Sequence, residues 1–455
     1  MSDLNWPSIT DETARHLQAL LRLDTTNPPG HELLAAECLA GVLAAEGIEP
    51  LVLESAPGRG NVIARLKGTG EKPPLLLYGH TDVVPAEPEH WSHPPFAGEI
   101  AGGYVWGRGA VDMKGSVAQQ LLVFLLLKRQ GVSLKRDVIF AATADEEIGG
   151  VDGYGISWLV RRHPDLLRAE FGLTEAGGYN REINGRPVYV IQVAEKGTCW
   201  LKVRAKGRPG HASMPHHDNA VVHLARAVDR LATRGLPHHL CSAAAGFLDA
   251  ASEAVGGDFG AALQSLKSPE GAAQLFAGEL KHHELYPFLF AMLHNTAAPT
   301  GMRAGLQTNV IPSVAEATID GRTLPGFDTE AFLRELRAVM AEGPAASGSD
   351  EFEYEVTLDS PPLETRHDTP LFALIAETLR RHDPRASVVP YMMSGATDAK
   401  YLAPLGMPTY GFAPIRFPPG LNVMSLAHAH DERAPVAGLG WGVRVLYEVV
   451  KEYCS

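Results

Sequence analysis

One short segment restricts the fold of this chain more than any other. It is the apolar run at residues 75–78, which leads into Gly79-His80-Thr81-Asp82. A short apolar run bounded by turn residues predicts a buried strand. Ligands of open α/β sheets bind where such strands end. We therefore interpret His80 as a candidate metal ligand and Asp82 as the carboxylate that orients its ring. A His-Asp pair that merely caps a strand is the alternative.

Strand-like and helix-like patterns alternate through the first part of the chain and again near its end. The expected strands are residues 50–53, 61–66, 75–78, 138–143, 171–174 and 387–391. The expected helices are residues 13–23, 31–46, 115–128, 371–381 and 438–453. This alternation predicts an α/β fold: a mostly parallel mixed sheet with helices on both faces.

The pattern changes near residue 197. Residues 198–205 alternate between polar and apolar side chains, as a half-exposed strand does. Expected elements follow at residues 219–233, 315–323, 329–340 and 352–358. Their order predicts a smaller α+β, ferredoxin-like domain at residues 198–358, inserted into a larger domain formed by residues 1–197 and 359–455. The Ala- and Gly-rich stretch 240–299 gives no clear boundaries.

Composition narrows the class of protein. The formal net charge of −13 argues against a general nucleic-acid binder, which would present a basic face. The four cysteines are far apart and form no CxxC pair, which suits a reducing compartment. Residues 1–11 lack a leader pattern, and no apolar run is long enough for a bilayer. We expect a cytoplasmic protein with a small-molecule substrate and no nucleic-acid or membrane partner.

Acidic residues and histidines gather at the predicted strand ends and in one late segment. They are His80, Asp82, Asp112, Glu146, Glu147, Glu175, His428 and His430. Unpaired carboxylates brought together would repel and raise each other's pKa, and divalent cations would offset this repulsion. Mixed histidine and carboxylate ligands suit zinc, with cobalt or manganese possible. The simpler alternatives are a solvated acidic turn for residues 145–147 and a helix N-cap for Asp112.

Several ordered segments resemble the signature of the M20 metallopeptidase family. Three carry most of the resemblance: residues 79–82, Gly107-Arg108-Gly109-Ala110-Val111-Asp112-Met113-Lys114-Gly115, and Asp145-Glu146-Glu147-Ile148-Gly149. Residues 207–213, 308–312, 394–398 and 426–432 also match, so the resemblance extends from about residue 20 to the C-terminus. That family includes aminoacylases, acetylornithine and succinyl-diaminopimelate deacylases, carboxypeptidases and dipeptidases.

The resemblance implies a two-metal site with two zinc ions per subunit, or cobalt or manganese in their place. Asp112 would bridge the ions, with His80 and Glu175 on one and Glu147 and His428 on the other. His430 is the weaker candidate in the last segment, and position 175 is Asp or Glu in the family. The resemblance also implies that Glu146 is the general base. Such a carboxylate takes a proton from the attacking water and passes it to the leaving nitrogen.

The resemblance assigns a role to the inserted domain as well: a lid that also forms the interface of a homodimer. His211 would come from the partner subunit and stabilise the oxyanion of the tetrahedral intermediate. Asn309 and Arg322 would contact the substrate, and a guanidinium can bind a carboxylate through two hydrogen bonds. Gly395 and Thr397 would line the pocket near the substrate's carboxylate. Without the resemblance, His211 and Arg322 fit ordinary surface positions.

The expected activity is metal-dependent hydrolysis of an amide bond next to a free carboxylate, by an N-acyl-amino-acid deacylase or a carboxypeptidase-like enzyme. The apolar insert before residues 293–312 resembles the carboxypeptidase S and N-acyl amino-acid amidohydrolase branch, which favours a bulky or apolar acyl group. An acetylornithine-type deacetylase and a di- or tripeptidase are alternatives. A catalytically inactive protein that binds a metal or small ligand is a third, and an intact Glu146 beside a full ligand set counts against it.

Overall fold

The computed structural model describes residues 4–149, 153–341, 352–421 and 423–455. Within them a large mixed sheet has the strand order β1-β2-β6-β3-β7-β18-β9-β16, and β8 and β17 also pair with β9. The strands are β1 (Pro50–Ala56), β2 (Arg59–Leu66), β3 (Leu75–His80), β6 (Val138–Thr143), β7 (Phe171–Thr174), β8 (Asn180–Ile183), β9 (Arg186–Glu195), β16 (Leu363–Glu364), β17 (Ser387–Met393) and β18 (Thr409–Gly411). β6, β3 and β7 are parallel neighbours, as are β7 and β18.

Helices cover both faces of this sheet, as expected. The reason is visible in β3, whose side chains are apolar on both faces of the sheet. Leu75 and Leu77 belong to the buried cluster on one face, and Leu76 and Tyr78 belong to the cluster on the other. One face packs against α1 (Trp6–Leu21), α2 (Glu32–Ala45), α3 (Lys114–Arg129), α12 (Pro370–His382) and α14 (Val436–Cys454). The other packs against α4 (Ile156–Arg162), α5 (Pro164–Leu167) and α13 (Ala399–Leu402). The α/β class with helices on both faces is confirmed.

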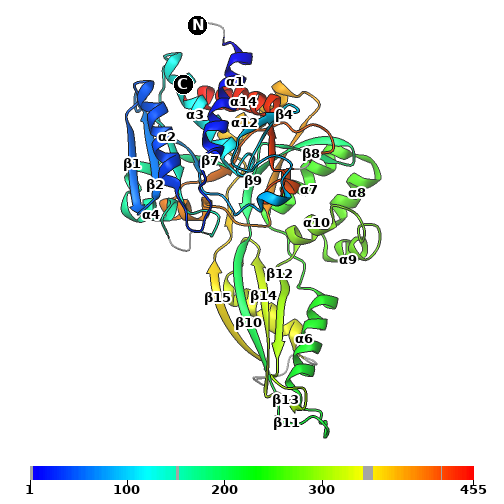
Figure 1. The fold of residues 1–455 in the computed structure, drawn as a ribbon. Coiled ribbons are helices and arrows are strands. Elements are labelled where there is room, and N and C mark those ends of the chain that lie inside the picture. The colour runs from blue at the N-terminus through cyan, green and yellow to red at the C-terminus, as the bar shows by residue number, and fades with distance from the viewer. Residues whose placement is uncertain (1–3, 150–152, 342–351, 422) are drawn as a thin grey trace.

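A second, smaller sheet forms a separate body (Figure 1). Its antiparallel strand order is β12-β14-β10-β15, from β10 (Gly197–Lys206), β12 (Thr296–Ala304), β14 (Val314–Thr323) and β15 (Phe352–Ser360). One face packs against α6 (Ala220–Arg234) and α11 (Thr329–Met340). The chain order β10-α6-β12-β14-α11-β15 is the ferredoxin-like order. A two-stranded pair, β11 (Gly210–His211) and β13 (Val310–Ile311), lies at the end remote from the large sheet (Figure 1).

The interval expected for the inserted domain contains two kinds of structure. Helices α7 (Ser242–Val255), α8 (Gly257–Ser265), α9 (Pro269–Ala277) and α10 (Tyr286–Leu293) do not join the small sheet. Their apolar side chains, such as Phe247 and Leu289, belong to the core of the large body, beside which these helices lie (Figure 1). Within the described residues, the chain therefore passes four times between the bodies, near residues 196, 238, 295 and 361.

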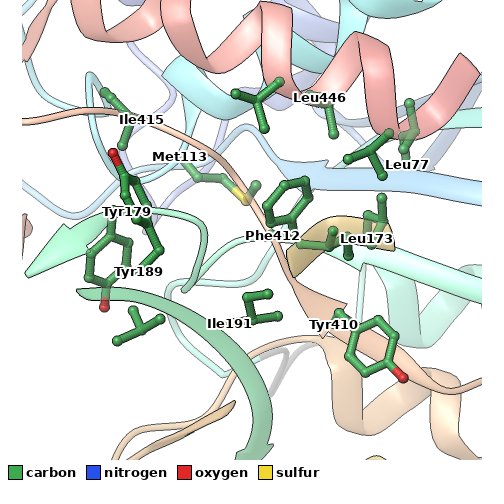
Figure 2. Close-up of a cluster of buried hydrophobic side chains, with 14 of the residues drawn as sticks. Leu77, Met113, Leu173, Tyr179, Tyr189, Ile191, Tyr410, Phe412, Ile415 and Leu446 are labelled. Atoms are coloured by element: carbon green, nitrogen blue, oxygen red, sulfur yellow. The ribbon is translucent and has the colours of Figure 1, made fainter. Parts of the chain in front are cut away.

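The core of the large body reaches the loop that carries Asp112. Figure 2 shows Met113, the next residue, among buried side chains that include Phe412 and Leu446. Met113 is 1% exposed, so the loop is anchored by apolar packing directly after its carboxylate. Among the described residues, no helix is both long and apolar enough to cross a bilayer.

Candidate metal centre

Candidate site residues lie at or just after the ends of three neighbouring strands, at one edge of the large sheet. β3 ends at His80, β6 is followed by Glu146 and Glu147, and β7 is followed by Glu175. Because the three strands are parallel, their carboxyl ends meet at the same edge. Ligand sites form there because side chains from several chain segments converge beyond the strand ends.

His80 is the buried centre of this group, with 2% of its surface exposed. Its Nε2 atom lies 3.2 Å from Asp112 Oδ1 and 3.6 Å from Glu175 Oε2. The nearest oxygen of Glu146 is 4.0 Å away. Three carboxylates from three different loops thus face one imidazole nitrogen.

His428 completes the group from the far end of the chain. Its Nε2 atom lies 3.2 Å from Asp112 Oδ2 and 3.0 Å from Glu147 Oε2. Asp112 therefore lies between the two imidazoles, one on each of its oxygens. His430 instead contacts Glu87, with 2.9 Å between Nε2 and Oε2, outside the group. The structure brings His428, and not His430, to the other ligand candidates.

Two sets of side chains in the described residues have donor atoms close enough to share an ion. One set is His80, Glu146 and Glu175, and the other is His80, Asp112 and Glu147, with all donor atoms of a set within 4.8 Å of one another. Imidazole and carboxylate donors in this number fit zinc. Glu146 enters the first set, so distance alone does not separate a ligand role from a base role for this residue.

The group is electrostatically unfavourable without added positive charge. Burial, followed by the charge of Asp112, raises the pKa of Glu147 to about 7. Burial and the charge of Glu175 raise the pKa of Glu146 well above its ordinary value, and burial also raises the pKa of Glu175. Hydrogen bonds with Asp112 and Glu147 raise the pKa of His428 to about 10. Such mutual repulsion among acids is what bound cations offset.

Asp82 is fully buried beneath the candidate ligands and contacts several of the segments that carry them. Its backbone carbonyl lies 3.0 Å from His80 Nδ1, the ring nitrogen that faces away from the group, and its carboxylate oxygen Oδ1 lies 3.4 Å from the same atom. The two carboxylate oxygens also accept the backbone N–H groups of Glu146 and Glu147, each at 3.1 Å, and the side-chain amide of Asn27 at 2.9 Å. Asp82 therefore orients the histidine through its carbonyl, with its carboxylate nearby, and that carboxylate holds the loop that carries both glutamates.

Glu432 does the same for the loop of Asp112. It is fully buried, and it accepts the backbone N–H groups of Gly109 (3.0 Å), Val111 (2.7 Å) and Asp112 (3.0 Å). Arg108 neutralises its charge through Nη1 at 2.8 Å. In the sequence, Glu432 is only the last residue of a matched segment, and no local pattern indicates this role.

A second buried network supports the turn before Glu146. Asp145 adopts the left-handed conformation, with φ of 70°, and it accepts the backbone N–H of Tyr154 at 2.9 Å. Arg59 pairs with Asp145 at 3.0 Å and with the buried carboxylate of Glu32 at 2.8 Å. Residues this far apart in the chain give no local pattern from which this support could be predicted.

Two of the expected substrate-contacting residues lie far from the metal ligands of their own chain. His211 is in β11, and the backbone carbonyl of Asn309 accepts the N–H of Ala212 at 3.0 Å. Both segments are at the remote end of the small body (Figure 1). The Ser213 hydroxyl lies 2.7 Å from His211 Nδ1, and the histidine is exposed.

Two other expected contacts have partners within the chain. Arg322, at the end of β14 nearest the large body, binds Asp320 at 2.6 and 3.0 Å and Thr198 Oγ1 at 3.0 Å. Thr397 is buried, and its N–H and hydroxyl both donate to Glu195 Oε2, at 2.9 and 2.7 Å. Gly395 borders a cavity of about 320 Å³ beside the metal-ligand candidates.

Comparison with known proteins decides the family. Residues 76–452 match the model of peptidase family M20/M25/M40. The chain belongs to this family. Aminoacylase-1 of Sus scrofa is 27% identical over 440 residues, which cover 96% of this chain and 93% of the aminoacylase. An N-fatty-acyl-amino acid synthase/hydrolase of Mus musculus is 28% identical over 385 residues, with 83% and 74% of the two chains covered.

A solved member of the M20 family has the same fold. It is an M20 family metallo-carboxypeptidase of Sulfolobus solfataricus, which matches with a TM-score of 0.71 and 20% identity over 97% of this chain and 99% of the other. The match to almost the entire length of this chain shows that both bodies of the M20 protein belong to the shared fold.

Proposed function

We propose that this M20 hydrolase cleaves N-acyl amino acids with the help of two bound zinc ions per subunit. The observation that carries the proposal is the convergence of His80, Asp112, Glu147, Glu175 and His428 around one site that also contains Glu146. Cobalt or manganese would also fit such ligands. Bound divalent cations would supply Lewis acidity, which polarises the scissile carbonyl and lowers the pKa of a water molecule.

The chain's own residues supply the proton transfers. The backbone of the Glu146 loop is held by Asp82, and that of Tyr154 by Asp145, which supports a base role for Glu146 beside the ligand candidates. The carboxylate accepts a proton from the attacking water and later donates it to the leaving nitrogen of the amide. Burial raises its pKa, which suits a group that must carry this proton between the two steps.

The substrate class rests on two supports. Two relatives that cover most of this chain are named as an aminoacylase and an N-fatty-acyl-amino acid hydrolase. An amide next to a free carboxylate also needs a cation or several N–H donors, and Arg322 is positioned at the junction of the two bodies. A carboxypeptidase-like activity is the second candidate, favoured by the metallo-carboxypeptidase of the same fold. The homodimer and the cytoplasmic location stay predictions.

The test is a turnover assay of metal-depleted and zinc-loaded protein on N-acyl amino acids, N-acetylornithine and dipeptides. We expect chelation to abolish turnover, zinc to restore it, and N-acyl amino acids to give the highest kcat/KM. Glu146→Gln should keep its zinc but lose roughly 10²–10⁴-fold in kcat, the usual contribution of a general base. Full activity of protein proven free of metal would overturn the metal requirement, and a preference for dipeptides would overturn the substrate class.

A further inference from the structure

The cavity beside the metal-ligand candidates has an unusual wall. Three of its lining residues are metal-ligand candidates: Asp112, Glu175 and His428. The remaining wall is mainly apolar and aromatic: Ala110, Val111, Ala176, Tyr179, Tyr391, Met393, Ala413, Ile415, Val423, Ala427 and Leu439. Tyr179 and Ile415 lie next to each other at one end of the buried cluster (Figure 2). A chamber of about 320 Å³ lined in this way fits an apolar group attached to the reacting amide.

The charges around the cavity exclude two kinds of occupant. Apart from the three candidate metal ligands, the described lining residues include no Asp, Glu, Lys, Arg or His. The α-carboxylate of a substrate would therefore find no cation inside. The free ammonium of a dipeptide would find no carboxylate that is not already committed to a metal. An uncharged group is the occupant that loses least on leaving water.

Three polar side chains of the wall have partners within the protein. Gln119 donates its side-chain amide to the carbonyls of Pro414 (2.9 Å) and Leu439 (3.1 Å). The phenols of Tyr179 and Tyr391 interact with each other, and burial raises the pKa of both. A polar ligand group would compete with these internal bonds, which favours a hydrocarbon chain.

The cavity and Arg322 belong to different bodies of the molecule. Every described residue of the cavity wall comes from the large body, from residues 110–179 and 391–439. Gly395, which the family resemblance places near the substrate's carboxylate, is part of this wall and would instead lie beside the acyl half. Arg322, the expected partner of the carboxylate, belongs to the small body, at the end of β10 and β14 next to the junction. The amino-acid half, with its carboxylate and side chain, would then lie toward the small body. The acyl half would point away from it, into the large body.

We propose that this cavity is the acyl-binding site and that it selects an uncharged, aliphatic acyl chain several carbons long over acetyl. The inference rests on the proposed function, because it assumes that the scissile bond is that of an N-acyl amino acid. Each methylene that leaves water for an apolar wall should raise kcat/KM roughly fourfold until the cavity is full. Selection would act on kcat/KM because the same burial persists in the transition state.

The experiment measures kcat/KM for one amino acid carrying acyl groups from acetyl to dodecanoyl. We expect a rise from acetyl to a medium-length chain and then a plateau or a fall. Ala413→Leu fills the cavity and should lower the ratio of medium-chain to acetyl kcat/KM at least tenfold. Ile415→Ala enlarges it and should move the preferred chain to greater length. These variants change the cavity in opposite directions, so misfolding of one leaves the other informative.

The matched control is Ala386→Leu, a residue as buried as Ala413 (6% against 8% exposed) that does not line the cavity. It should keep the wild-type chain-length profile. A preference of the wild type for acetyl, or a profile unchanged in both cavity variants, overturns the inference while leaving the proposed function intact. A second contrary result is that the cavity variants alter kcat/KM only along a series of N-acetyl amino acids with different side chains. That result would assign the cavity to the amino-acid half instead. Absence of turnover on every N-acyl amino acid would overturn the proposed function itself.

Discussion

Two fully buried carboxylates, Asp82 and Glu432, support the candidate metal centre and are not ligand candidates themselves. Each accepts backbone N–H groups of a loop that carries ligand candidates. A buried carboxylate is stable only when its oxygens are satisfied, and here the partners are the backbone of the site. The ligand geometry is therefore held by main-chain hydrogen bonds as well as by side-chain packing.

Replacing Glu432 should weaken metal binding more than it affects the fold. Glu432→Gln keeps the size of the side chain but turns an N–H group toward Gly109 or toward Val111 and Asp112, whose own N–H groups then lose an acceptor. We expect the affinity for zinc to fall by roughly 10- to 100-fold, the usual effect of losing the group that orients a ligand. Competition with a chromogenic chelator measures the affinity.

The control for this variant is Glu87→Gln, at an exposed carboxylate whose partner is His430. That variant should bind zinc like the wild type. Circular dichroism of both metal-free variants should match the wild type. Zinc affinity of Glu432→Gln equal to that of the wild type would contradict the positioning role.

Among the residues of the site, the sequence predicts those that stand next to a recognisable local pattern. His80, Glu146, Glu147 and Glu175 follow directly from where apolar strands end. The choice between His428 and His430 depended on the family pattern, and the structure brings the former to Asp112. The role of Glu432 could not be predicted, because its four donors lie more than 300 residues away. Nothing in a single sequence distinguishes a buried acceptor from a solvated acid in an Asp-Glu pair.

Among the elements, the passage from β9 to β10 has the most unusual chemistry. Only Lys196 separates the two strands, and it is 1% exposed. Its ammonium group donates to the carbonyls of Ala291 (2.9 Å) and His294 (2.7 Å) and to Thr296 Oγ1 (3.2 Å). One side chain thereby ties the β9–β10 passage to the passage from α10 to β12. Burial lowers the pKa of Lys196 to about 7.

This lowered pKa predicts a pH dependence of stability. Between pH 7 and about 10.5, the unfolded chain holds a proton on Lys196 that the folded chain has released, so stability should rise with pH across this window. The contribution has a slope of at most about 1.4 kcal/mol per pH unit. Lys196→Met should remove it, so the Tm of the wild type should rise relative to that of the variant from pH 7 to pH 9.

Lys202→Met, on β10, is the matched control. The Tm of the wild type relative to this variant should not change over the same pH range. Thermal unfolding followed at several pH values measures all three proteins. Parallel curves for the wild type and Lys196→Met would show that the amine titrates at its ordinary pKa.

Some helices and strands could not be predicted, because packing between distant segments determines where they begin, end or pack. β9 is absent from the expected strands. Only Lys196 separates it from β10, so no turn segment marks where one strand ends and the next begins. β18 is only three residues long and gives no period. For α7–α10, an apolar helix face indicates that a helix packs on something, but not on which of two sheets. By contrast, α11 was expected at its exact bounds, because its polar and apolar faces are distinct and Asp328 caps its first turn.

The whole molecule separates His211 from the metal ligands of its own chain. The histidine is at the remote end of the small body, and the ligand candidates are at the edge of the large sheet (Figure 1). If His211 acts on the oxyanion of a partner subunit, the protein is a dimer and His211→Ala should lose roughly 10²–10³-fold in kcat. His217→Ala, an exposed neighbour, should retain wild-type activity.

Subunit exchange distinguishes action across subunits from action within one chain. Mixed dimers of His211→Ala and Glu146→Gln would contain one site with both defects and one with neither. We expect activity to return on mixing, as measured by turnover after exchange proven by mass spectrometry of labelled subunits. No recovery despite exchange, or a fully active monomer, would leave His211 without a role across the interface.

The four passages between the two bodies also set an order for synthesis on the ribosome. The small sheet is complete once β15 has emerged, at Ser360. The large sheet still lacks β17 and β18 at that point, and β9 depends on both as neighbours. The body that is inserted can therefore fold before the body that encloses it, the reverse of the usual N-terminal-first sequence. His428 emerges later still, so a nascent chain cannot close its metal centre until nearly all of it has been translated.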